Sequence, residues 1–178
     1  MLKGKLVSLF AVEKEDLQKL CDWRNNPEFR KHFREYRELN MAQQENWFED
    51  KVVKDNTTLM FSIRRNEDNE LLGCCGFVYI NWVHRHADLS LYVGWKDAYI
   101  DEEGYAEESC RLLLDYGFNE LCLNKIWTEI YEFDDKKKIL YDQFGFQQDG
   151  LLRQNYWYNG EWWNSRILSI IQSEYLNG

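Results

Sequence analysis

The sequence lacks the usual signs of a segmented or membrane-bound chain. It contains one proline, Pro27, and no repeat, low-complexity tract or linker. No apolar run approaches the roughly 18 residues that a transmembrane helix requires, and the first residues show no signal-peptide pattern. A chain of 178 residues can bury a sizeable core without disulfides. We therefore expect a single domain over residues 1–178 and no association with a membrane.

An excess of positive charge is also missing. The 31 Asp and Glu residues outnumber the 22 Lys and Arg residues, which leaves a net charge of −9. Nucleic-acid binding needs a basic surface to meet the phosphates, so this balance argues against a nucleic-acid partner. It is compatible with a cationic substrate, although solubility alone also explains an acidic surface.

The cysteines lack the spacing of a metal site. There are five of them, an odd number: Cys21, Cys74, Cys75, Cys110 and Cys122. Without a signal peptide, we expect reduced thiols in the cytoplasm and no bound metal. Each cysteine is expected to pack as a small buried hydrophobe rather than to act as a nucleophile.

The pattern of apolar residues predicts strands grouped first and a strand–helix–strand unit after them. A helix is expected to open at Glu13 and to break at Asn25-Asn26-Pro27. Asn159-Gly160 is a strong hairpin signal. This order predicts an α+β fold with a mixed sheet. The other expected elements are strands at Leu6–Phe10, Leu59–Ile63, Leu71–Ile80, Ala87–Val93, Lys125–Tyr131, Leu151–Tyr158 and Trp163–Ile171, and helices at Gln43–Val53, after Gly104 and from Asp135.

The stretch from Asp88 to Phe146 is the most informative part of the chain. Gly104-Tyr105-Ala106 opens a helix with small residues, which would let backbone N–H groups approach a phosphate. Taken alone, this glycine could equally be a turn before a helix. Tyr141 lies just before a Gly-Phe stop and is either a proton donor or a core aromatic.

Three blocks and their order resemble a known superfamily. They are Asp22–Glu28 (DWRNNPE), Gly104-Tyr105-Ala106 with Glu108, and Leu140–Phe146 (LYDQFGF). The chain resembles the GNAT superfamily of N-acetyltransferases over nearly its whole length. It is similar to the branch that contains ribosomal-protein N-terminal acetyltransferases and spermidine acetyltransferases. The resemblance implies a mixed, mostly antiparallel twisted sheet flanked by helices, with a central strand–helix–strand acetyl-CoA site.

The implied reaction is transfer of an acetyl group from acetyl-CoA to a primary amine, by direct attack on the thioester. A polyamine, an amino sugar and a protein N-terminus are the acceptors that the resemblance suggests. Tyr141 matches the family's general acid. Asp88 and then Glu129 are candidate bases, with structural ion pairing as the competing interpretation for both. The residues implied to bind the co-substrate are Tyr92, Val93, Gly94, Gly104, Tyr105, Ala106, Asp134 and Lys137.

Four residues depart from the family's pattern. Asp101 and Glu103 precede Gly104, where the family has non-acidic or basic residues, and carboxylates there repel a pyrophosphate unless they point outward. Asp134 and Lys137 stand where an Asn and a small residue are usual. Lys137 and its neighbours either add positive charge near the phosphates or form a solvated helix face. The alternative function is a non-catalytic GNAT-fold protein that binds a ligand or a partner.

Aromatic residues could line the acceptor site or an interface. A homodimer that uses the aromatic C-terminal hairpin is a further expectation. The candidates for lining the acceptor site are Glu28, Arg30, Tyr36, Trp47, Tyr156, Trp157 and Tyr158.

Overall fold

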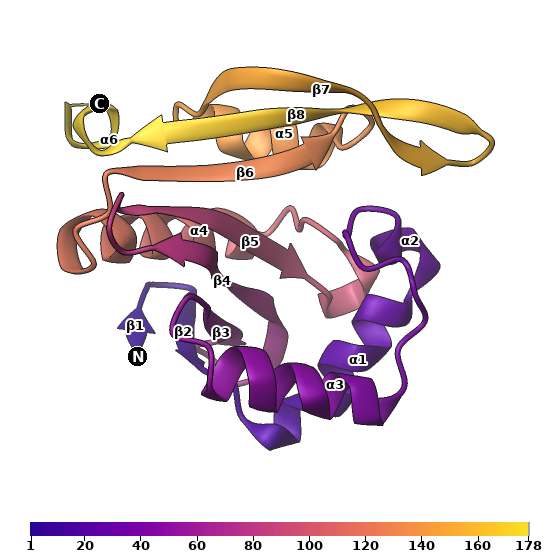
Figure 1. Ribbon diagram of the computed structural model, residues 1–178. Helices are drawn as coiled ribbons and strands as arrows, with labels where there is room; N and C mark the ends of the chain where they lie inside the picture. Colours follow the sequence, from indigo (N-terminus) through magenta and orange to yellow (C-terminus); the bar gives the residue numbers. More distant parts are fainter. Residues whose placement is uncertain (178) are drawn as a thin grey trace.

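The computed structural model describes residues 1–177 and is built around one twisted sheet (Figure 1). Its strands lie in the order β1-β2-β3-β4-β5-β6-β8-β7. All neighbours are antiparallel except β5 and β6, which are parallel. The strands are β1 (Leu2–Lys3), β2 (Val7–Ala11), β3 (Leu59–Arg65), β4 (Leu71–Asn81), β5 (His86–Val93), β6 (Lys125–Tyr131), β7 (Gln147–Tyr158) and β8 (Glu161–Ile171).

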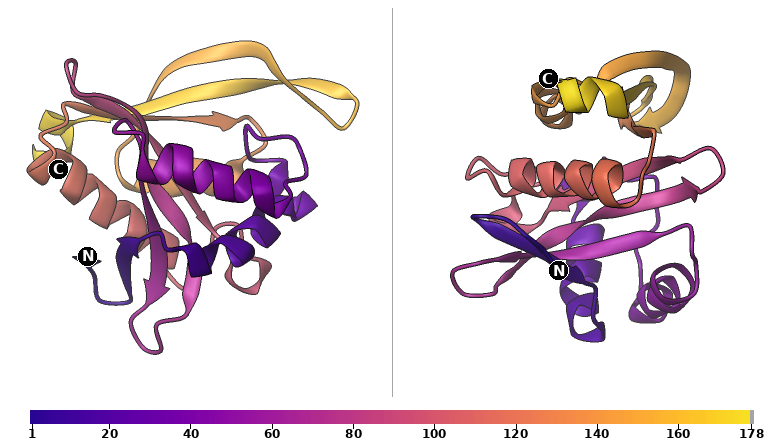
Figure 2. Two further views of the ribbon diagram at one scale, coloured as in Figure 1. Left: turned by 60° about the horizontal axis from the view of Figure 1, so that its bottom comes forward. Right: turned by 90° about the vertical axis from the view of Figure 1, so that its left-hand side faces the viewer.

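Helices cover both faces of the sheet (Figures 1 and 2). Two of them continue as π-helical turns, α3 over Phe48–Val53 and α4 over Tyr116–Glu120. Short 3-10 turns occupy Lys14–Asp16 and Trp95–Asp97. The α-helices are α1 (Leu17–Asn25), α2 (Pro27–Arg30), α3 (Met41–Trp47), α4 (Tyr105–Asp115), α5 (Asp135–Gln143) and α6 (Gln172–Asn177). Within residues 1–177, none of the helices has the length and apolar character needed to cross a membrane.

Local sequence explains two of the chain reversals. Pro27 cannot continue α1, and the Asn26 side chain accepts a hydrogen bond from the Glu28 N–H (3.0 Å), so α2 starts in a new direction. At the other end of the chain, Asn159 and Gly160 adopt φ angles of 52° and 84°. These left-handed values suit a two-residue hairpin turn, and both predicted reversals are confirmed.

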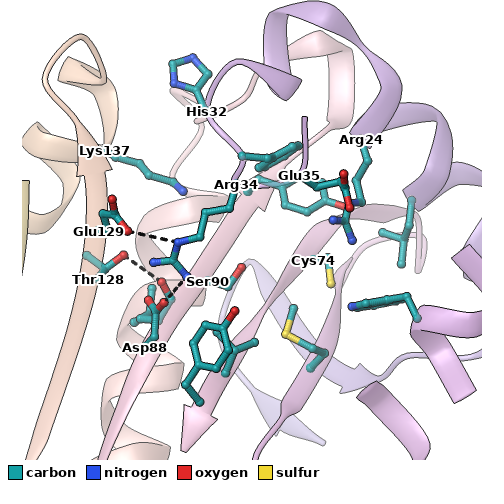
Figure 3. Close-up of a pocket in the computed structure, with 18 of the residues that line it drawn as sticks. Arg24, His32, Arg34, Glu35, Cys74, Asp88, Ser90, Thr128, Glu129 and Lys137 are labelled. Carbon is teal, nitrogen blue, oxygen red and sulfur yellow. Dashed lines mark hydrogen bonds and ion pairs between the residues drawn. The ribbon is translucent and has the colours of Figure 1, made fainter. Parts of the chain in front are cut away.

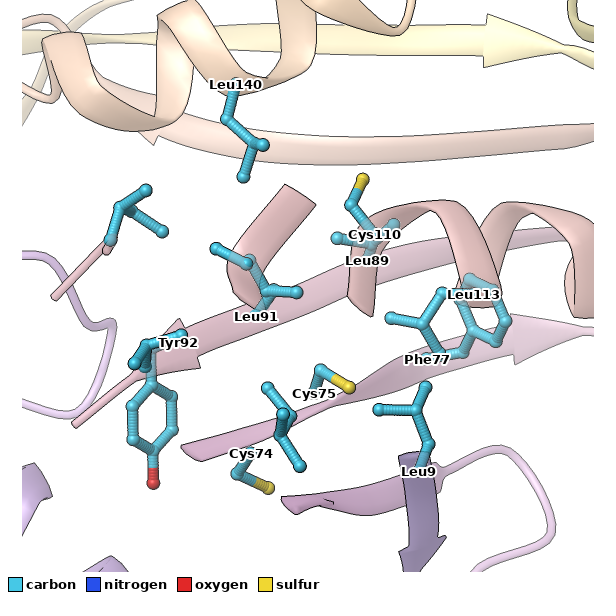
Figure 4. Close-up of a cluster of buried hydrophobic side chains, with 14 of the residues drawn as sticks. Leu9, Cys74, Cys75, Phe77, Leu89, Leu91, Tyr92, Cys110, Leu113 and Leu140 are labelled. Atoms are coloured by element: carbon cyan, nitrogen blue, oxygen red, sulfur yellow. The ribbon is translucent and has the colours of Figure 1, made fainter. Parts of the chain in front are cut away.

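Strand β5 separates an apolar side of the sheet from a polar one. Its side chains alternate, so Leu89 and Leu91 pack toward Cys110 and Leu113 of α4 (Figure 4). The intervening residues, Asp88, Ser90 and Tyr92, line a cavity on the opposite face, which α1 and α3 cover. Burial of the apolar side fixes the register, and the register in turn points Asp88 at the cavity.

Strands β5 and β6 pair only at their beginnings. The ladder joins His86 to Lys125, Ala87 to Ile126 and Asp88 to Trp127. Beyond Asp88 the strands diverge, as Figure 1 shows. The Thr128 hydroxyl still reaches across to donate to the Leu89 carbonyl (3.0 Å). The result is a wedge-shaped opening in the middle of the sheet.

The predicted fold class is confirmed, with corrections at several element boundaries. The helix expected over Gln43–Val53 begins at Met41 and changes to a π-helix at Phe48. The helix expected to open at Glu13 begins as a 3-10 turn that Glu13 caps. Strand β7 begins at Gln147 rather than Leu151, because pairing with β8 extends it past its apolar residues. β1, α2 and α6 have too few residues to show a periodic pattern, and the sequence did not predict them.

Candidate active site

A cavity of about 210 Å³ lies on the polar face of β5, and we call it the β5 cavity (Figure 3). Asp88, Ser90 and Tyr92 form its floor, with Thr128 and Glu129 of β6 beside them. The other lining residues come from β3, β4, α1, α3, α5 and the loop after α2, and include Tyr79, Arg24, Trp47, Lys137, His32 and Glu35.

Arg34 is the central cation of this cavity. Its Nη1 lies 2.6 Å from Asp88 Oδ2, and its Nε lies 3.3 Å from Glu129 Oε2. The rings of Tyr79 and Trp127 flank the guanidinium, with centroids 5.8 and 5.9 Å from its central carbon. Two carboxylates and two aromatic faces are the groups that bind an organic cation in proteins. These groups therefore form a cation site, and the guanidinium of Arg34 occupies it.

The loop that carries Arg34 is held by a residue of α1. Asn25 donates through Nδ2 to the Leu39 carbonyl (2.7 Å) and accepts from the Leu39 N–H (2.7 Å). Arg37 pairs with Glu35 on the same loop at 2.7 Å. The Asn25 contacts fix the end of the loop at Leu39, yet the Arg34 side chain remains 42% exposed.

Asp88 has the electrostatics of a base that works near neutrality. Its side chain is almost completely buried, and burial raises the pKa of its carboxyl to about 6 from an ordinary 3.8. Arg34 acts in the opposite direction by charge and by hydrogen bonding. At pH 7 the carboxyl is therefore mainly ionised, and it becomes protonated as the pH falls through 6.

A second polar cluster closes one wall of the β5 cavity. Asp134 caps α5 by accepting from the Lys137 N–H (3.2 Å), and it also accepts from the Tyr99 hydroxyl (3.3 Å). His32 Nδ1 lies 3.2 Å from Asp134 Oδ2, and the imidazole stacks on the Tyr99 ring with centroids 4.2 Å apart. Burial acts to raise the pKa of Asp134, but the contact with His32 and the charge of Lys137 outweigh it and keep the pKa below its ordinary value.

A second cavity, of about 550 Å³, lies beyond this wall, and we call it the hairpin cavity. His32 lines both cavities. The hairpin cavity also contains the carboxylates of Asp97 and Asp135 and the rings of Tyr158 and Trp163. Acidic and aromatic groups thus continue from one cavity into the next.

Tyr141 lies on α5 close to Thr128, whose side chain lines the β5 cavity. It is fully buried, and its hydroxyl makes no hydrogen bond of normal geometry within residues 1–177, although Thr128 is near enough to influence its pKa. Burial raises the pKa of its phenol well above the usual range. A buried donor without a partner is rare and calls for a ligand or a functional explanation.

The start of α4 has the shape of an anion site but already holds an anion. Gly104 precedes the helix at φ 93°, a left-handed conformation that a side chain would strain. The N–H groups of Tyr105 and Ala106 are the first free donors of the helix. Both donate to the carboxylate of Asp101, at 2.8 and 2.7 Å. Asp101 therefore turns toward the helix start, so of the two interpretations left open by the sequence, the one in which this carboxylate points outward is wrong.

The end of β5 is likewise engaged by the loop that follows it. The Val93 N–H donates to the Tyr99 carbonyl (3.0 Å), whereas the Gly94 N–H donates to the Leu72 carbonyl of β4 (2.7 Å). Further along the loop, the Tyr99 hydroxyl donates to Asp134 (3.3 Å) and Lys136 donates to the Ile100 carbonyl (3.5 Å), so residues 95–103 reach from the end of β5 to the start of α5. Two consecutive residues of this loop, Lys96 and Asp97, have φ angles of 51° and 55°, a conformation that is costly for side chains other than glycine.

The order of strands, the divergence of β5 from β6 and the helix that starts at Gly104 can now be compared with known proteins. The family model for the acetyltransferase (GNAT) domain matches residues 7–147. The chain belongs to the GNAT family.

Spermidine acetyltransferases are among its curated relatives. Spermidine N(1)-acetyltransferase of Vibrio cholerae is 27% identical over 171 residues, with 96% of each chain covered. The Escherichia coli K12 enzyme of the same name is 27% identical over 170 residues, with 96% of this chain and 88% of the relative covered. A crystal structure of the V. cholerae enzyme in complex with CoA and spermine has a TM-score of 0.87 at 26% identity, covering 97% and 99% of the two chains.

The GNAT chain is an N-acetyltransferase that uses acetyl-CoA as its co-substrate. Its framework suits that molecule: the opening between β5 and β6, the left-handed Gly104 and the unpartnered Tyr141 hydroxyl are all present. The donors at Val93, Tyr105 and Ala106 are engaged by the chain itself.

The structure brings the predicted site residues together in two groups. Asp88, Glu129 and Lys137 meet in the β5 cavity, so Lys137 does not lie on a solvated helix face. Gly104, Tyr105 and Ala106 lie at the start of α4, and Asp134 caps α5. Trp47 lines the β5 cavity, while Glu28 and Tyr158 line the hairpin cavity. The other acceptor-site candidates, Arg30, Tyr36, Tyr156 and Trp157, are not among the lining residues of either cavity.

Sequence reasoning missed Arg34, His32 and Tyr99. Each lies in a loop, where no periodic pattern shows which way a side chain points. His32 and Arg34 reach the site because Asn25 anchors their loop from α1, a contact that no local motif encodes. Tyr99 could have been suspected from the apolar pair Tyr99-Ile100 inside an otherwise polar loop, since both residues are buried.

Proposed function

We propose that the acceptor is a polyamine, a linear amine with more than one cationic nitrogen. The observation that carries this proposal is the pair of carboxylates, Asp88 and Glu129, closed around a cation between two aromatic rings. A primary ammonium has the same requirements as the guanidinium of Arg34, so it can compete for the same place. The names of the spermidine acetyltransferase relatives support the same substrate class.

Space for a second cationic nitrogen supports a polyamine over a simple amine. The hairpin cavity adjoins the β5 cavity at His32, and its acidic residues outnumber its lysines. The acidic residues are Glu28, Asp97, Asp134 and Asp135, and the lysines are Lys31 and Lys136. A flexible chain that crosses this wall would place one nitrogen near Asp88 and another near these acids. An amino sugar is too compact to use both cavities.

Asp88 is the proposed base. An acceptor arrives as an ammonium and must lose a proton before its nitrogen attacks. Asp88 is mainly ionised at pH 7. It lines the cavity together with Thr128 of β6, next to the place where β5 and β6 stop pairing. Glu129 shares the cation with Asp88, and we assign it to holding and orienting the amine.

Tyr141 is the proposed acid. Acetyl-CoA supplies the thioester, whose sulfur needs a proton as it leaves. Because burial keeps the Tyr141 phenol protonated at neutral pH, its unpartnered hydroxyl is available as the donor. Thr128 lies close to both groups, because it lines the β5 cavity with Asp88 and its side chain is near the Tyr141 hydroxyl.

A panel of amines with CoA release as the signal tests the substrate class. We expect kcat/KM for spermidine and spermine to exceed that for glucosamine and for a free peptide N-terminus by at least tenfold, about the worth of one charge-assisted contact. Glu129→Gln should reduce the preference, while Glu161→Gln on the exposed hairpin tip is the matched control. A glucosamine or peptide rate above the spermidine rate would refute the polyamine.

A homodimer through the C-terminal hairpin is a second, separate proposal. β7 is an edge strand of the sheet, and Leu151, Leu152, Trp157 and Trp162 are exposed along β7 and β8. Light scattering on the native protein and on Trp157→Ser tests it, and a monomeric native protein contradicts it. We also propose a cytoplasmic location, which the five free cysteines support.

A further inference from the structure

A buried primary amine lies in the active site and has no part in the chemistry above. It belongs to Lys137, which is 8% exposed and lines the β5 cavity. The buried residues of α5 are Lys137, Leu140 and Tyr141. Their spacing places all three side chains on one face of the helix. Lys137 therefore lies one helical turn before the tyrosine proposed as the acid, on the same face of α5.

The surroundings of Lys137 also include the proposed base. Asp134 and Asp88 are the two opposite charges that act on its ammonium, and Arg34 is the like charge. Its nitrogen lies 5.1 Å from the centroid of the Tyr99 ring, in the loop that follows β5. Burial lowers the pKa of Lys137, which increases the fraction of amine that is neutral and nucleophilic. Figure 3 shows the side chain directed into the cavity, toward Arg34.

We propose that Lys137 is itself an acetyl acceptor, so that the chain acetylates its own active site. This inference rests on the acid and base of the proposed function but not on the polyamine. The Lys137 ammonium first gives one proton to Asp88. Its nitrogen then bonds to the acetyl carbon while the carbon–sulfur bond breaks and the departing sulfur takes a proton from Tyr141. The second proton from the nitrogen restores the Tyr141 phenol, and the proton held by Asp88 passes to water. One acetyl-CoA thus yields acetyl-lysine, CoA and one released proton.

Acetylation changes the cavity in two ways. It removes the positive charge that faces Asp134 and Asp88, and it adds an acetyl group to a space of about 210 Å³. The acetylated protein is expected to have a higher KM for spermidine because less of the cavity is open. A slow loss of activity during storage with acetyl-CoA would accompany the modification.

Three adjacent lysines in the same protein provide the test. The native protein is incubated with acetyl-CoA and no added amine, and acetylation is followed at each lysine by peptide mass spectrometry. Lys136 and Lys138 are less buried than Lys137. We expect Lys137 to react at least tenfold faster than either neighbour when folded, and at a similar rate in concentrated urea, where only chemical acetylation remains.

Variants separate self-acetylation from chemical reactivity. Asp88→Asn and Tyr141→Phe should each slow acetylation of Lys137 at least tenfold. Lys137→Arg keeps the cation and should gain no acetyl group beyond the Lys136 and Lys138 background. A Lys137 rate no higher than that of its neighbours overturns the inference, and so does fast acetylation that Tyr141→Phe leaves unchanged.

The same samples distinguish this inference from the polyamine proposal. Acetylation of Lys137 without acetylation of spermidine supports the inference and refutes the polyamine. Acetylation of spermidine without reaction at Lys137 refutes the inference alone. Failure to react with both refutes self-acetylation, and thermal stabilisation by acetyl-CoA then shows whether the co-substrate binds.

Discussion

The β5 cavity and the start of α4 each hold an ion of the kind that a ligand would bring. In the cavity a guanidinium lies between Asp88 and Glu129, where an amine acceptor would place its ammonium. At α4 the Asp101 carboxylate accepts from Tyr105 and Ala106, where a pyrophosphate would place its oxygens. Binding at either place is an exchange of partners, so it gains less free energy than binding to free groups.

The two internal ions differ in what remains when they leave. Arg34 is partly exposed, and its departure uncovers the buried carboxylate of Asp88 and the partly buried carboxylate of Glu129, which need another cation. Asp101 forms two short bonds that also stabilise the start of a helix, and its departure uncovers backbone donors that water can satisfy. We infer that the carboxylates of the cavity need another cation when Arg34 leaves, whereas the N–H groups at the start of α4 can bind either an anion or water when Asp101 leaves. Four substitutions examine that contrast.

The largest effect is expected from Tyr141→Phe, which removes the hydroxyl proposed as the general acid. Loss of a general acid typically costs about 10²- to 10⁴-fold in rate. We expect kcat for spermidine to fall by about 10²-fold or more, with the Kd of CoA within about twofold of native because the hydroxyl makes no hydrogen bond of normal geometry whose loss would disturb the fold. Tyr175→Phe, which loses a hydroxyl bonded to Asp115, is the matched control. An unchanged kcat removes Tyr141 from the mechanism.

Asp88→Asn tests the base and its pH dependence. The native kcat/KM should rise with pH through about 6, because the carboxyl acts in its ionised form and burial places its pKa there. In the variant, kcat should fall by about 10²-fold and the rise near pH 6 should disappear. Glu129→Gln should retain that rise. If the rise instead disappears in Glu129→Gln and persists in Asp88→Asn, the two roles are reversed.

Asp101→Ala examines the anion at α4. Removing one negative charge a few ångströms from a phosphate is worth about 1 kcal/mol in water, so CoA should bind about fivefold more tightly by calorimetry. The loss of a helix cap should lower Tm by a few degrees, about 1 kcal/mol of stability. Glu102→Ala removes a nearby charge whose side chain makes no contact with these N–H groups, and it should change the Kd much less. Weaker CoA binding in Asp101→Ala would mean that the carboxylate preorganises the site.

The smallest effect is expected from Arg34→Met. Without the guanidinium, the pKa of Asp88 should rise further above 6, because Arg34 is the group that most lowers it. The rise of kcat/KM should therefore move to higher pH, and the KM for spermidine above that pH should fall by about threefold. Arg37→Met, on the same loop but paired with Glu35, is the control. A higher KM without a pH shift would show that Arg34 holds the loop rather than the acceptor's place.

Much of the fold could be predicted because its signals are local. Alternating residues marked β5, Asn26-Pro27 marked a chain reversal, and Asn159-Gly160 marked the final hairpin. Asp88 and Glu129 could be expected on adjacent strands for the same reason, and the structure places both beside Arg34. Element boundaries were less accurate, because cross-strand pairing extends β7 beyond its own apolar residues.

The sequence alone determined the α+β order of elements, the acidic character and the resemblance to the GNAT family, since these depend on residue types and short spacings. Only the tertiary structure decided the occupants of the site. Arg34 is 54 residues from Asp88 along the chain, and Asp101 faces inward because the loop folds back on α4. The sequence shows which residues are charged. Which residue pairs with each of them depends on chain reversals between distant segments, and packing decides those reversals.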